Sequence, residues 1–267
     1  MKRIAAAMLG LLLLATPPAV QAQFGYTTNA DNTLTVTNYS GPGGAVIFPT
    51  TAYGLPVTGI GSGTAPVFSG ASVTSVTIPA SVASVNYGAF AYCSSMVSAT
   101  ISNGVTSIGN FAFFRCSGLA AVTIPGSVTN LGGYAFEACY ALTGVYFMGN
   151  APVVDDPPSL FQDDPTIVYY LPGTKGWSAF SDSSGISTVL WNPVIQTSGA
   201  SFGLTNSQFG FKIICTNNIM AVVEACTNLA RPVWTSLQNI AITNGSVYFS
   251  EPFQANRPGR YYRLRSP

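Results

Sequence analysis

A 23-residue repeat is the feature of this sequence that most restricts its fold. Four β-branched segments start at this constant interval: Val76-Thr77-Ile78-Pro79, Ala99-Thr100-Ile101-Ser102, Val122-Thr123-Ile124-Pro125 and Val145-Tyr146-Phe147-Met148. Five further apolar columns keep the same spacing: Val82, Val105 and Val128; Val85, Ile108 and Leu131; Phe90, Phe113 and Phe136; Cys93, Cys116 and Cys139; Met96, Leu119 and Leu142. One such unit cannot bury its own apolar side, whereas stacked units bury a continuous core. The repeat therefore predicts a solenoid.

Each repeat divides into a strand half and a return half. The V-x-I segment suits a short strand, and its copies should align as a parallel sheet with Ile78, Ile101 and Ile124 inside. The A-F-x-x-C half, with apolar residues at spacings of three, predicts a helical or tight-turn return. The pattern blurs at both ends, so we predict about five coils, of which three are regular. Residues 24–40 alternate like strands and should cap the first coil.

The repeat motifs resemble those of a known class of bacterial surface proteins. V-T-I-P, S-V-T-[SN]-[IL]-G and A-F-x-x-C-x-x-L, as in Ser127–Gly132 and Ala135–Leu142, resemble the leucine-rich repeats of BspA-like proteins over residues 43–193. The resemblance implies an extracytoplasmic, non-catalytic scaffold that is linked with adhesion or protein binding.

The N-terminus predicts export. Met1-Lys2-Arg3 precedes an apolar run of 12 residues and a small-x-small end at Val20-x-Ala22, which is the pattern of a secretory signal cleaved before Gln23. The alternative, a membrane anchor, would need about 20 apolar residues. We therefore predict a signal peptide over 1–22, a solenoid with strand caps over 23–193, a C-terminal module over 194–267, and a secreted or cell-surface protein that is not transmembrane.

The C-terminal module shows alternating apolar segments separated by turn signals, which predict a small antiparallel β-sandwich with Trp234 in its core. Cys215 and Cys226 bracket a predicted hairpin that turns near Asn217-Asn218, and in that register they lie too far apart to form a disulfide. The strings V-E-A-C-T-N-L and G-R-Y-Y-R-L-R-S-P resemble a β-module that ends many secreted multi-domain bacterial proteins.

Composition excludes several chemistries. The chain has no His, which removes Ser-His-Asp and Cys-His nucleophile pairs and His-ligated metals. The string Gly199-Ala200-Ser201-Phe202-Gly203 matches a nucleophile elbow, but the elbow needs a His partner, so we interpret the match as accidental. Ten Lys or Arg against nine Asp or Glu leave too little basic surface for nucleic acid. We expect no cofactor and no catalysis.

Two clusters of ionisable groups have both a functional and a structural interpretation. Cys93, Cys116 and Cys139 form one column, which we predict as a buried thiol ladder rather than a disulfide or a zinc site. Asp155, Asp156, Asp163 and Asp164 are the only carboxylate cluster. We predict a solvated loop there, with a weak Ca²⁺ site as one alternative and a glycosidase acid/base pair as another.

Three surfaces are candidates for binding. The residues between the two buried columns of each strand should point outward in a row: Thr77, Thr100, Thr123 and Tyr146. The return segments group aromatics, among them Tyr92, around Arg115, the only Lys or Arg in residues 24–172. On the terminal strand, Arg263 and Arg265 share one face and could meet an acidic glycan, an anionic envelope surface or sorting machinery, or form a solvated face that pairs with Glu224 or Glu251.

These features favour a secreted or cell-surface, non-catalytic scaffold that binds a protein or glycan ligand, or serves adhesion. Two alternatives remain open at this point. The solenoid could be a spacer with an attachment or sorting module at its C-terminus, or the Asp155–Asp164 loop could act on a polysaccharide.

Overall fold

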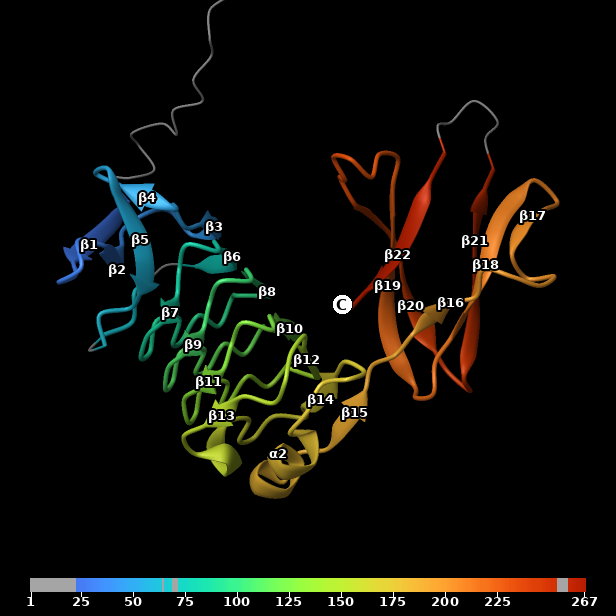
Figure 1. Ribbon diagram of the computed structural model, residues 1–267. Coiled ribbons are helices and arrows are strands. Elements are labelled where there is room, and N and C mark those ends of the chain that lie inside the picture. Colours follow the sequence, from blue (N-terminus) through green and yellow to red (C-terminus); the bar gives the residue numbers. More distant parts are fainter. Residues whose placement is uncertain (1–22, 64, 69–71, 254–258) are drawn as a thin grey trace, which may run out of the picture.

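A computed structural model of the protein describes residues 23–63, 65–68, 72–253 and 259–267. It contains a solenoid whose coils stack along one axis, followed by a smaller body of antiparallel strands (Figure 1). The predicted signal peptide over residues 1–22 lies outside the described residues.

The coils of the solenoid build two parallel sheets. The front sheet is made of two groups of strands: β3 (Gly44–Ile47), β6 (Val73–Ile78) and β8 (Ser98–Ile101), then β10 (Ala121–Ile124), β12 (Gly144–Phe147), β14 (Ile167–Tyr170) and β15 (Thr188–Leu190). The back sheet joins β5 (Leu55–Ile60) to four two-residue strands, β7 (Ser84–Val85), β9 (Ser107–Ile108), β11 (Asn130–Leu131) and β13 (Val153–Val154).

The strand register is the register of the sequence repeat. Thr77 pairs with Thr100 and Thr123 pairs with Tyr146, in each case with the equivalent residue of the next repeat. The predicted fold class, mainly β with a short solenoid and a C-terminal antiparallel part, is confirmed. The solenoid has about seven turns rather than five, because the end coils keep the strands while their loops differ in length and hide the period.

The six sequence columns form the core. Phe90, Phe113 and Phe136 are fully buried and stack in one column, with ring centroids 5.0 and 5.2 Å apart. The columns that contain Ile78, Ile101 and Ile124 and Cys93, Cys116 and Cys139 lie in the same cluster. Of the two forms predicted for the return halves, a helix or a tight turn, the structure has the tight turn.

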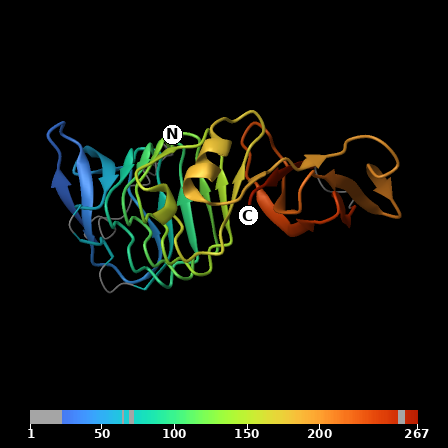
Figure 2. The same cartoon turned by 90° about the horizontal axis from the view of Figure 1, so that it is seen from below.

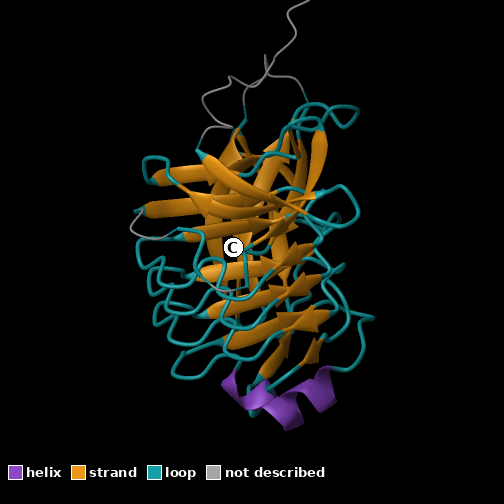
Figure 3. Cartoon of the chain, turned by 90° about the vertical axis from the view of Figure 1, so that its left-hand side faces the viewer, coloured by secondary structure: helices purple, strands orange, loops and turns teal. Residues whose placement is uncertain are grey.

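Both ends of the solenoid are covered. At the N-terminal end, β1 (Phe24–Thr28) and β2 (Leu34–Tyr39) form an antiparallel hairpin, as the alternation predicted, and β4 (Thr51–Ala52) pairs with β5. At the other end the 3-10 helix η1 (Pro157–Ser159) and the helix α2 (Trp177–Ser184) close the last coils (Figure 3). Trp177 and Phe180 of α2 pack their rings on Phe147, which shields the core from water.

The C-terminal body has two antiparallel sheets. One contains β16 (Val194–Ile195), β17 (Gly203–Thr205), β18 (Gln208–Ile214) and β21 (Ser246–Pro252); the other contains β19 (Ile219–Cys226), β20 (Thr235–Ile242) and β22 (Tyr261–Arg265). The predicted hairpin at Asn217-Asn218 is wrong, because this turn carries the chain from one sheet to the other. Trp234 is half-buried beneath a guanidinium instead of lying in the core.

The C-terminal body packs directly on the last strands of the front sheet, and Figure 2 shows it next to the end of the solenoid where these coils lie. Tyr146 of β12 and Tyr169 of β14 stack with centroids 4.7 Å apart and belong to the same buried cluster as Phe211 and Ile213 of β18. Trp191, in the connection, meets Tyr146 edge to face and donates its indole N–H to Met220 O at 3.1 Å. A shared apolar cluster therefore connects the two bodies.

Candidate functional site

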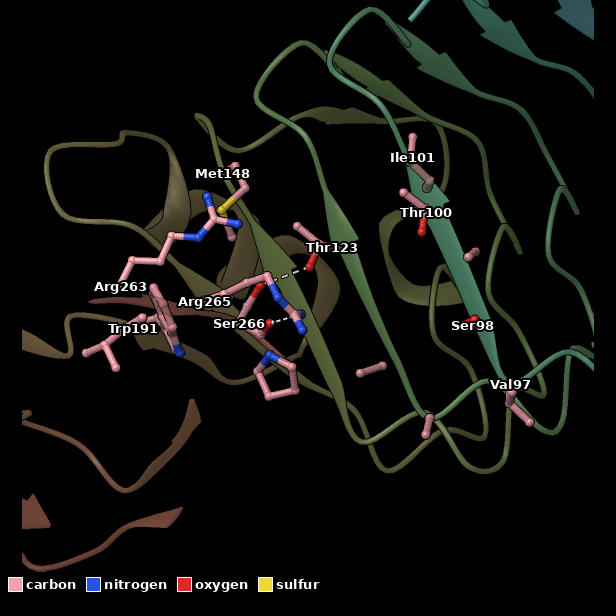
Figure 4. Close-up of a pocket in the computed structure, with 15 residues that line it drawn as sticks. Val97, Ser98, Thr100, Ile101, Thr123, Met148, Trp191, Arg263, Arg265 and Ser266 are labelled. Atoms are coloured by element: carbon pink, nitrogen blue, oxygen red, sulfur yellow. Dashed lines mark hydrogen bonds between the residues drawn. The ribbon is translucent and has the colours of Figure 1, made fainter. Parts of the chain in front are cut away.

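A groove of about 800 Å³ lies where the front sheet meets the C-terminal strand (Figure 4). We call it the interdomain groove. Its solenoid wall consists of Val97–Ile101 on and beside β8 and of Ala120, Ala121, Thr123 and Met148; its other wall consists of Trp191 and Arg263–Pro267. Domain interfaces are a common location for ligand sites, and this volume lies in the usual range for them.

The predicted threonine row runs along the front sheet into this groove. Thr77 is half-buried and lies outside the groove, whereas Thr100 is exposed on the groove wall. Thr123 is half-buried, and its hydroxyl shares a hydrogen bond of 3.0 Å with the hydroxyl of Ser266. From Thr100 onward, the row thus becomes more covered with each coil toward the C-terminal body.

Tyr146 corrects the sequence prediction. It does point away from the solenoid core, as its place in the row required, but only 3% of it is exposed, because the C-terminal body covers it. Burial, together with the neighbouring Tyr169, raises the pKa of Tyr146 above its ordinary value. Its contacts are those of a packing residue between the two bodies, and it offers no free surface to a ligand.

Arg263 and Arg265 reach the groove from β22, and both bind the buried carboxylate of Glu224 on the neighbouring β19. Arg263 places Nε and Nη2 at 2.7 Å from Oε2, and Arg265 places Nε at 2.8 Å from Oε1. The guanidinium of Arg263 also lies 4.2 Å above the ring of Trp234. Of the two predicted carboxylate partners, Glu224 pairs with these arginines, while Glu251 binds Arg260 and Tyr262 instead.

The charge of this cluster does not balance. Burial by itself raises the pKa of Glu224, but the hydrogen bonds from Arg265 and Arg263 lower it below its ordinary value, so the carboxylate is ionised at neutral pH. Two guanidiniums then share one carboxylate, so Glu224 can neutralise only one of them. The two arginine side chains are 45% and 42% exposed, and each has N–H donors beyond those that Glu224 accepts.

The hydrogen-bonded pairing of the front-sheet strands is interrupted at the groove. No strand pairing joins β8 to β10 among the described residues, although each pairs with its other neighbour. Pro125, directly after β10, lacks the N–H that Ser102 and Met148, its equivalents in the flanking coils, donate to the coil before, so this hydrogen bond between the coils is missing. The groove therefore opens where the coil-to-coil ladder is incomplete.

A second surface lies on the turn edge of the coils. Here two columns of residues adopt the left-handed backbone region: Gly88, Phe111 and Tyr134, then Tyr92, Arg115 and Ala138, with φ between 58 and 67°. This conformation lets every second N–H reach the next coil, as in Tyr92 N to Phe114 O at 2.7 Å and Arg115 N to Glu137 O at 2.9 Å. Five of the six residues are not glycine, at a cost of about 1–2 kcal/mol each.

The side chains of the first column offset this cost by stacking. The rings of Phe111 and Tyr134 lie parallel with centroids 4.9 Å apart, and Tyr87 packs on Phe111. In the second column Tyr92 remains 62% exposed, and Arg115 is exposed with its guanidinium 5.2 Å above Phe114 and 5.9 Å from Tyr92. Tyr92, Ser94, Arg115, Ser117, Ala138 and Tyr140 line a pocket of about 240 Å³.

The acidic loop places its carboxylates in different environments. Asp155 and Asp163 are exposed, and Asp156 precedes η1. Among the described residues there is no group of three or more His, Cys, Asp or Glu that could hold a metal ion. Burial first, and then the nearby charges of Asp163 and Glu137, raise the pKa of Asp164 to about 7.

The cysteines form the predicted thiol column. Cys116 donates to Phe90 O at 3.2 Å, Cys139 donates to Phe113 O at 3.1 Å, and Cys93 is buried beside them. Cys215 and Cys226 are buried and free as well. The Gly199–Gly203 string lies in the exposed connection that leads into β17, where it meets no catalytic partner among the described residues.

The groove was not predictable as a unit. The threonine row and the arginine pair were separate candidates in distant parts of the chain, and their meeting depends on how the two bodies pack. The one signal in the sequence was the surplus of cations after residue 172, which places positive charge in the body that faces the threonine row. The turn-edge residues Tyr92 and Arg115 do lie together, as the shared column predicted.

These features define a β-solenoid repeat protein with an attached β-module, and comparison with known proteins agrees. Residues 63–159 match the model of the BspA type leucine rich repeat region in six copies. A leucine-rich repeat protein from Bacteroides capillosus is 30% identical over 48% of this chain and 95% of its own length, with a TM-score of 0.42. The chain belongs to the BspA-type leucine-rich repeat family.

Two other solved structures are similar. A leucine-rich repeat protein of Treponema pallidum is 27% identical over 55% of this chain and 69% of its own, with a TM-score of 0.51. A leucine-rich cell surface protein of Faecalibacterium prausnitzii is 22% identical over 74% of this chain and 58% of its own, with a TM-score of 0.37. No curated protein matches the sequence. Within the described ranges, no helix is both long and apolar enough to span a bilayer.

Proposed function

We propose that this protein is a secreted or cell-surface, non-catalytic scaffold that binds a protein or glycan ligand in the interdomain groove. Residues 1–22 direct export, 23–193 form the solenoid and 194–267 form the module that completes the groove. The observation that carries the proposal is that the exposed hydroxyl of Thr100 and the guanidiniums of Arg263 and Arg265 line one groove.

The chemistry of the groove favours a ligand with negative charge. Its lining contains two guanidiniums and several hydroxyls, but no Asp or Glu. Guanidinium groups bind carboxylates through charge-assisted hydrogen bonds, which are stronger than neutral ones. The groove offers no nucleophile paired with a base, which supports binding rather than catalysis.

The test is ligand binding by a variant that fills the groove. Thr100→Trp adds bulk to an exposed position on the groove wall, whereas Thr77→Trp makes the same change one coil earlier, outside the groove. Immobilised residues 23–267 would be probed with polygalacturonate, heparin and polyglutamate by surface plasmon resonance. We expect at least one polymer to bind, with an affinity that falls as salt rises because the contact is charged.

Thr100→Trp should weaken that binding by about tenfold or more, since each 1.4 kcal/mol of lost contact corresponds to a factor of about ten. Thr77→Trp should bind like the wild type. Equal loss in both variants, or no binding by the wild type to any of the three polymers, would contradict the assignment of the groove.

A further inference from the structure

The turn-edge pocket is built as a grid of two columns across three consecutive coils. Its members are Tyr92 and Ser94 in the first coil, Arg115 and Ser117 in the second, and Ala138 and Tyr140 in the third, each pair on either side of a core cysteine. The repeat places equivalent positions in adjacent coils one above another, as the backbone bonds from Tyr92 to Phe114 and from Arg115 to Glu137 show. Three coils therefore present six side chains on one small surface.

The size and exposure of the side chain at each of the six positions determine the shape of the pocket. The two tyrosines stand at opposite corners and are 62% and 59% exposed, so their rings rise above the surface. Ala138, which is only 3% exposed, keeps the floor low beside them. Ser94 and Ser117 are small and leave the space between the rings open. At about 240 Å³ the pocket is smaller than a typical drug-sized site and suits one ring-sized molecule.

Arg115 supplies the polar anchor of the pocket. It is the only Lys or Arg in residues 24–172, and it makes none of the three salt bridges found in the described part of the chain. Its guanidinium packs against the ring of Phe114, and its charge interacts with Glu137, but no carboxylate lies within salt-bridge distance of its N–H donors. An oriented donor group without a salt-bridge partner in the protein is suited to oxygen atoms of a ligand.

The backbone supports a role for these side chains beyond folding. Tyr92 and Arg115 occupy left-handed positions, where glycine would be unstrained, and Gly88 fills the corresponding place in the other column. Strained non-glycine residues persist where their side chains are needed, and they gather at ligand sites. Stacking explains Phe111 and Tyr134. Tyr92 meets Phe114 edge to face, but the residue is still 62% exposed.

We propose that this pocket binds a single pyranose unit of a neutral glycan. The sugar would lie between the rings of Tyr92 and Tyr140 and contact both, and its hydroxyls would accept hydrogen bonds from Arg115 and exchange them with Ser94 and Ser117. A neutral sugar fits better than an acidic one, because Glu137, whose carboxylate interacts with Arg115, and the nearby Asp163 already place negative charge beside the pocket. A protein partner would need an interface several times larger than this pocket.

This inference is independent of the interdomain groove. The pocket lies on the turn edge of the coils that contain Cys93, Cys116 and Cys139, and none of its residues lines the groove. A glycan bound here could therefore be held whether or not the groove is occupied.

The experiment measures sugar binding to residues 23–267 by saturation-transfer NMR and calorimetry. The probes are the methyl glycosides of glucose, galactose, mannose and N-acetylglucosamine and their homotrisaccharides. A pocket that holds one ring should give a Kd on the order of millimolar with at least one probe. Tyr92→Ala and Tyr140→Ala should each raise this Kd by about tenfold, the upper value for loss of one ring contact. Tyr92→Phe should stay within about threefold, because the ring face is retained.

Tyr53→Ala is the matched control. Tyr53 is an exposed tyrosine that also has a positive φ, but it lies in the first coils, outside the pocket. It should bind like the wild type, as should Thr100→Trp in the groove. No binding of any probe by the wild type, or equal losses in Tyr53→Ala and Tyr92→Ala, would overturn the proposal. Loss of sugar binding in Thr100→Trp alone would overturn it as well, and would place the sugar in the groove instead.

Discussion

Phe113 and Phe136, which occupy the same column of adjacent repeats, stack with their ring centroids 5.2 Å apart and their planes within 1° of parallel. Each ring is fully buried, and each backbone is tied to the next coil through alternate N–H groups such as Phe113 N to Ala135 O at 2.8 Å. One sequence period is therefore one coil of the solenoid. Stability in such an array comes from contacts between neighbouring coils rather than within one.

Phe113→Ala should be among the most destabilising substitutions in the chain. It leaves a cavity between the rings of Phe90 and Phe136. We expect the free energy of unfolding to fall by about 3–5 kcal/mol. Urea unfolding followed by circular dichroism measures this loss. Tyr87→Ala, which removes a half-exposed ring on the same edge, should cost much less. Similar losses in the two variants would show that the phenylalanine column does not carry the core.

Trp191→Ala should loosen the C-terminal body from the solenoid. The substitution removes the edge-to-face contact with Tyr146 and the indole hydrogen bond to Met220 O. In the variant we expect calorimetry to resolve two unfolding transitions, one for each body. In the wild type the two bodies should unfold more nearly together, because the shared apolar cluster connects them. Phe202→Ala, an exposed ring in the C-terminal body, provides the control and should leave the profile unchanged.

Asp164→Asn should stabilise the protein at neutral and alkaline pH. Both carboxylate oxygens are buried without a hydrogen-bond partner, and the nearby Cys139 N–H already donates to Phe136 O. The pKa of Asp164 is raised from 3.8 to about 7, so the folded state holds this proton where the unfolded state has lost it. The penalty is therefore absent below about pH 4, grows between pH 4 and 7, and is complete above pH 7.

The measurement is the free energy of unfolding of both proteins from pH 4 to pH 8. We expect a gain of about 1–3 kcal/mol for Asp164→Asn at pH 8, toward the lower end because the residue is half-buried, and no gain near pH 4. The same substitution at the exposed Asp155 should change nothing across this range. A gain that is independent of pH would point to a cause other than the carboxylate charge.

The five cysteines should be unreactive in the folded protein. All five are buried as free thiols, and burial raises the pKa of Cys93 to about 12, which leaves almost no thiolate at pH 8. A chromogenic disulfide reagent should label none of them in the native state and all five after denaturation without reductant. Fewer than five labelled thiols after denaturation would mean that a disulfide forms in the isolated protein.

Local periodicity made much of the solenoid predictable. The repeating columns identified which side chains are buried, which residues form the strands and which coil stacks on which, because each coil repeats the same contacts with its neighbours. Where periodicity failed, the prediction failed with it. The end coils were undercounted because their loops vary in length, and the turn at Asn217-Asn218 was interpreted as a hairpin although it joins two sheets.

The candidate site was only half predictable for the same reason. Tyr92 and Arg115 share a column, so their approach on the turn edge follows from the repeat. The hydrogen bond between Thr123 and Ser266 follows from no period, because it depends on where the C-terminal body packs. The same packing buried Tyr146, which the repeat alone had placed in water.

The sequence by itself determined the coil, the core ladder and the outward direction of the threonine row, since these depend on contacts between neighbouring repeats that the period specifies. Only the tertiary structure decided which part of that row stays open and where the groove lies. Those outcomes depend on the docking of Tyr146, Tyr169 and Trp191 against a non-repeating body, and long-range apolar packing of that kind leaves no regular spacing in the chain.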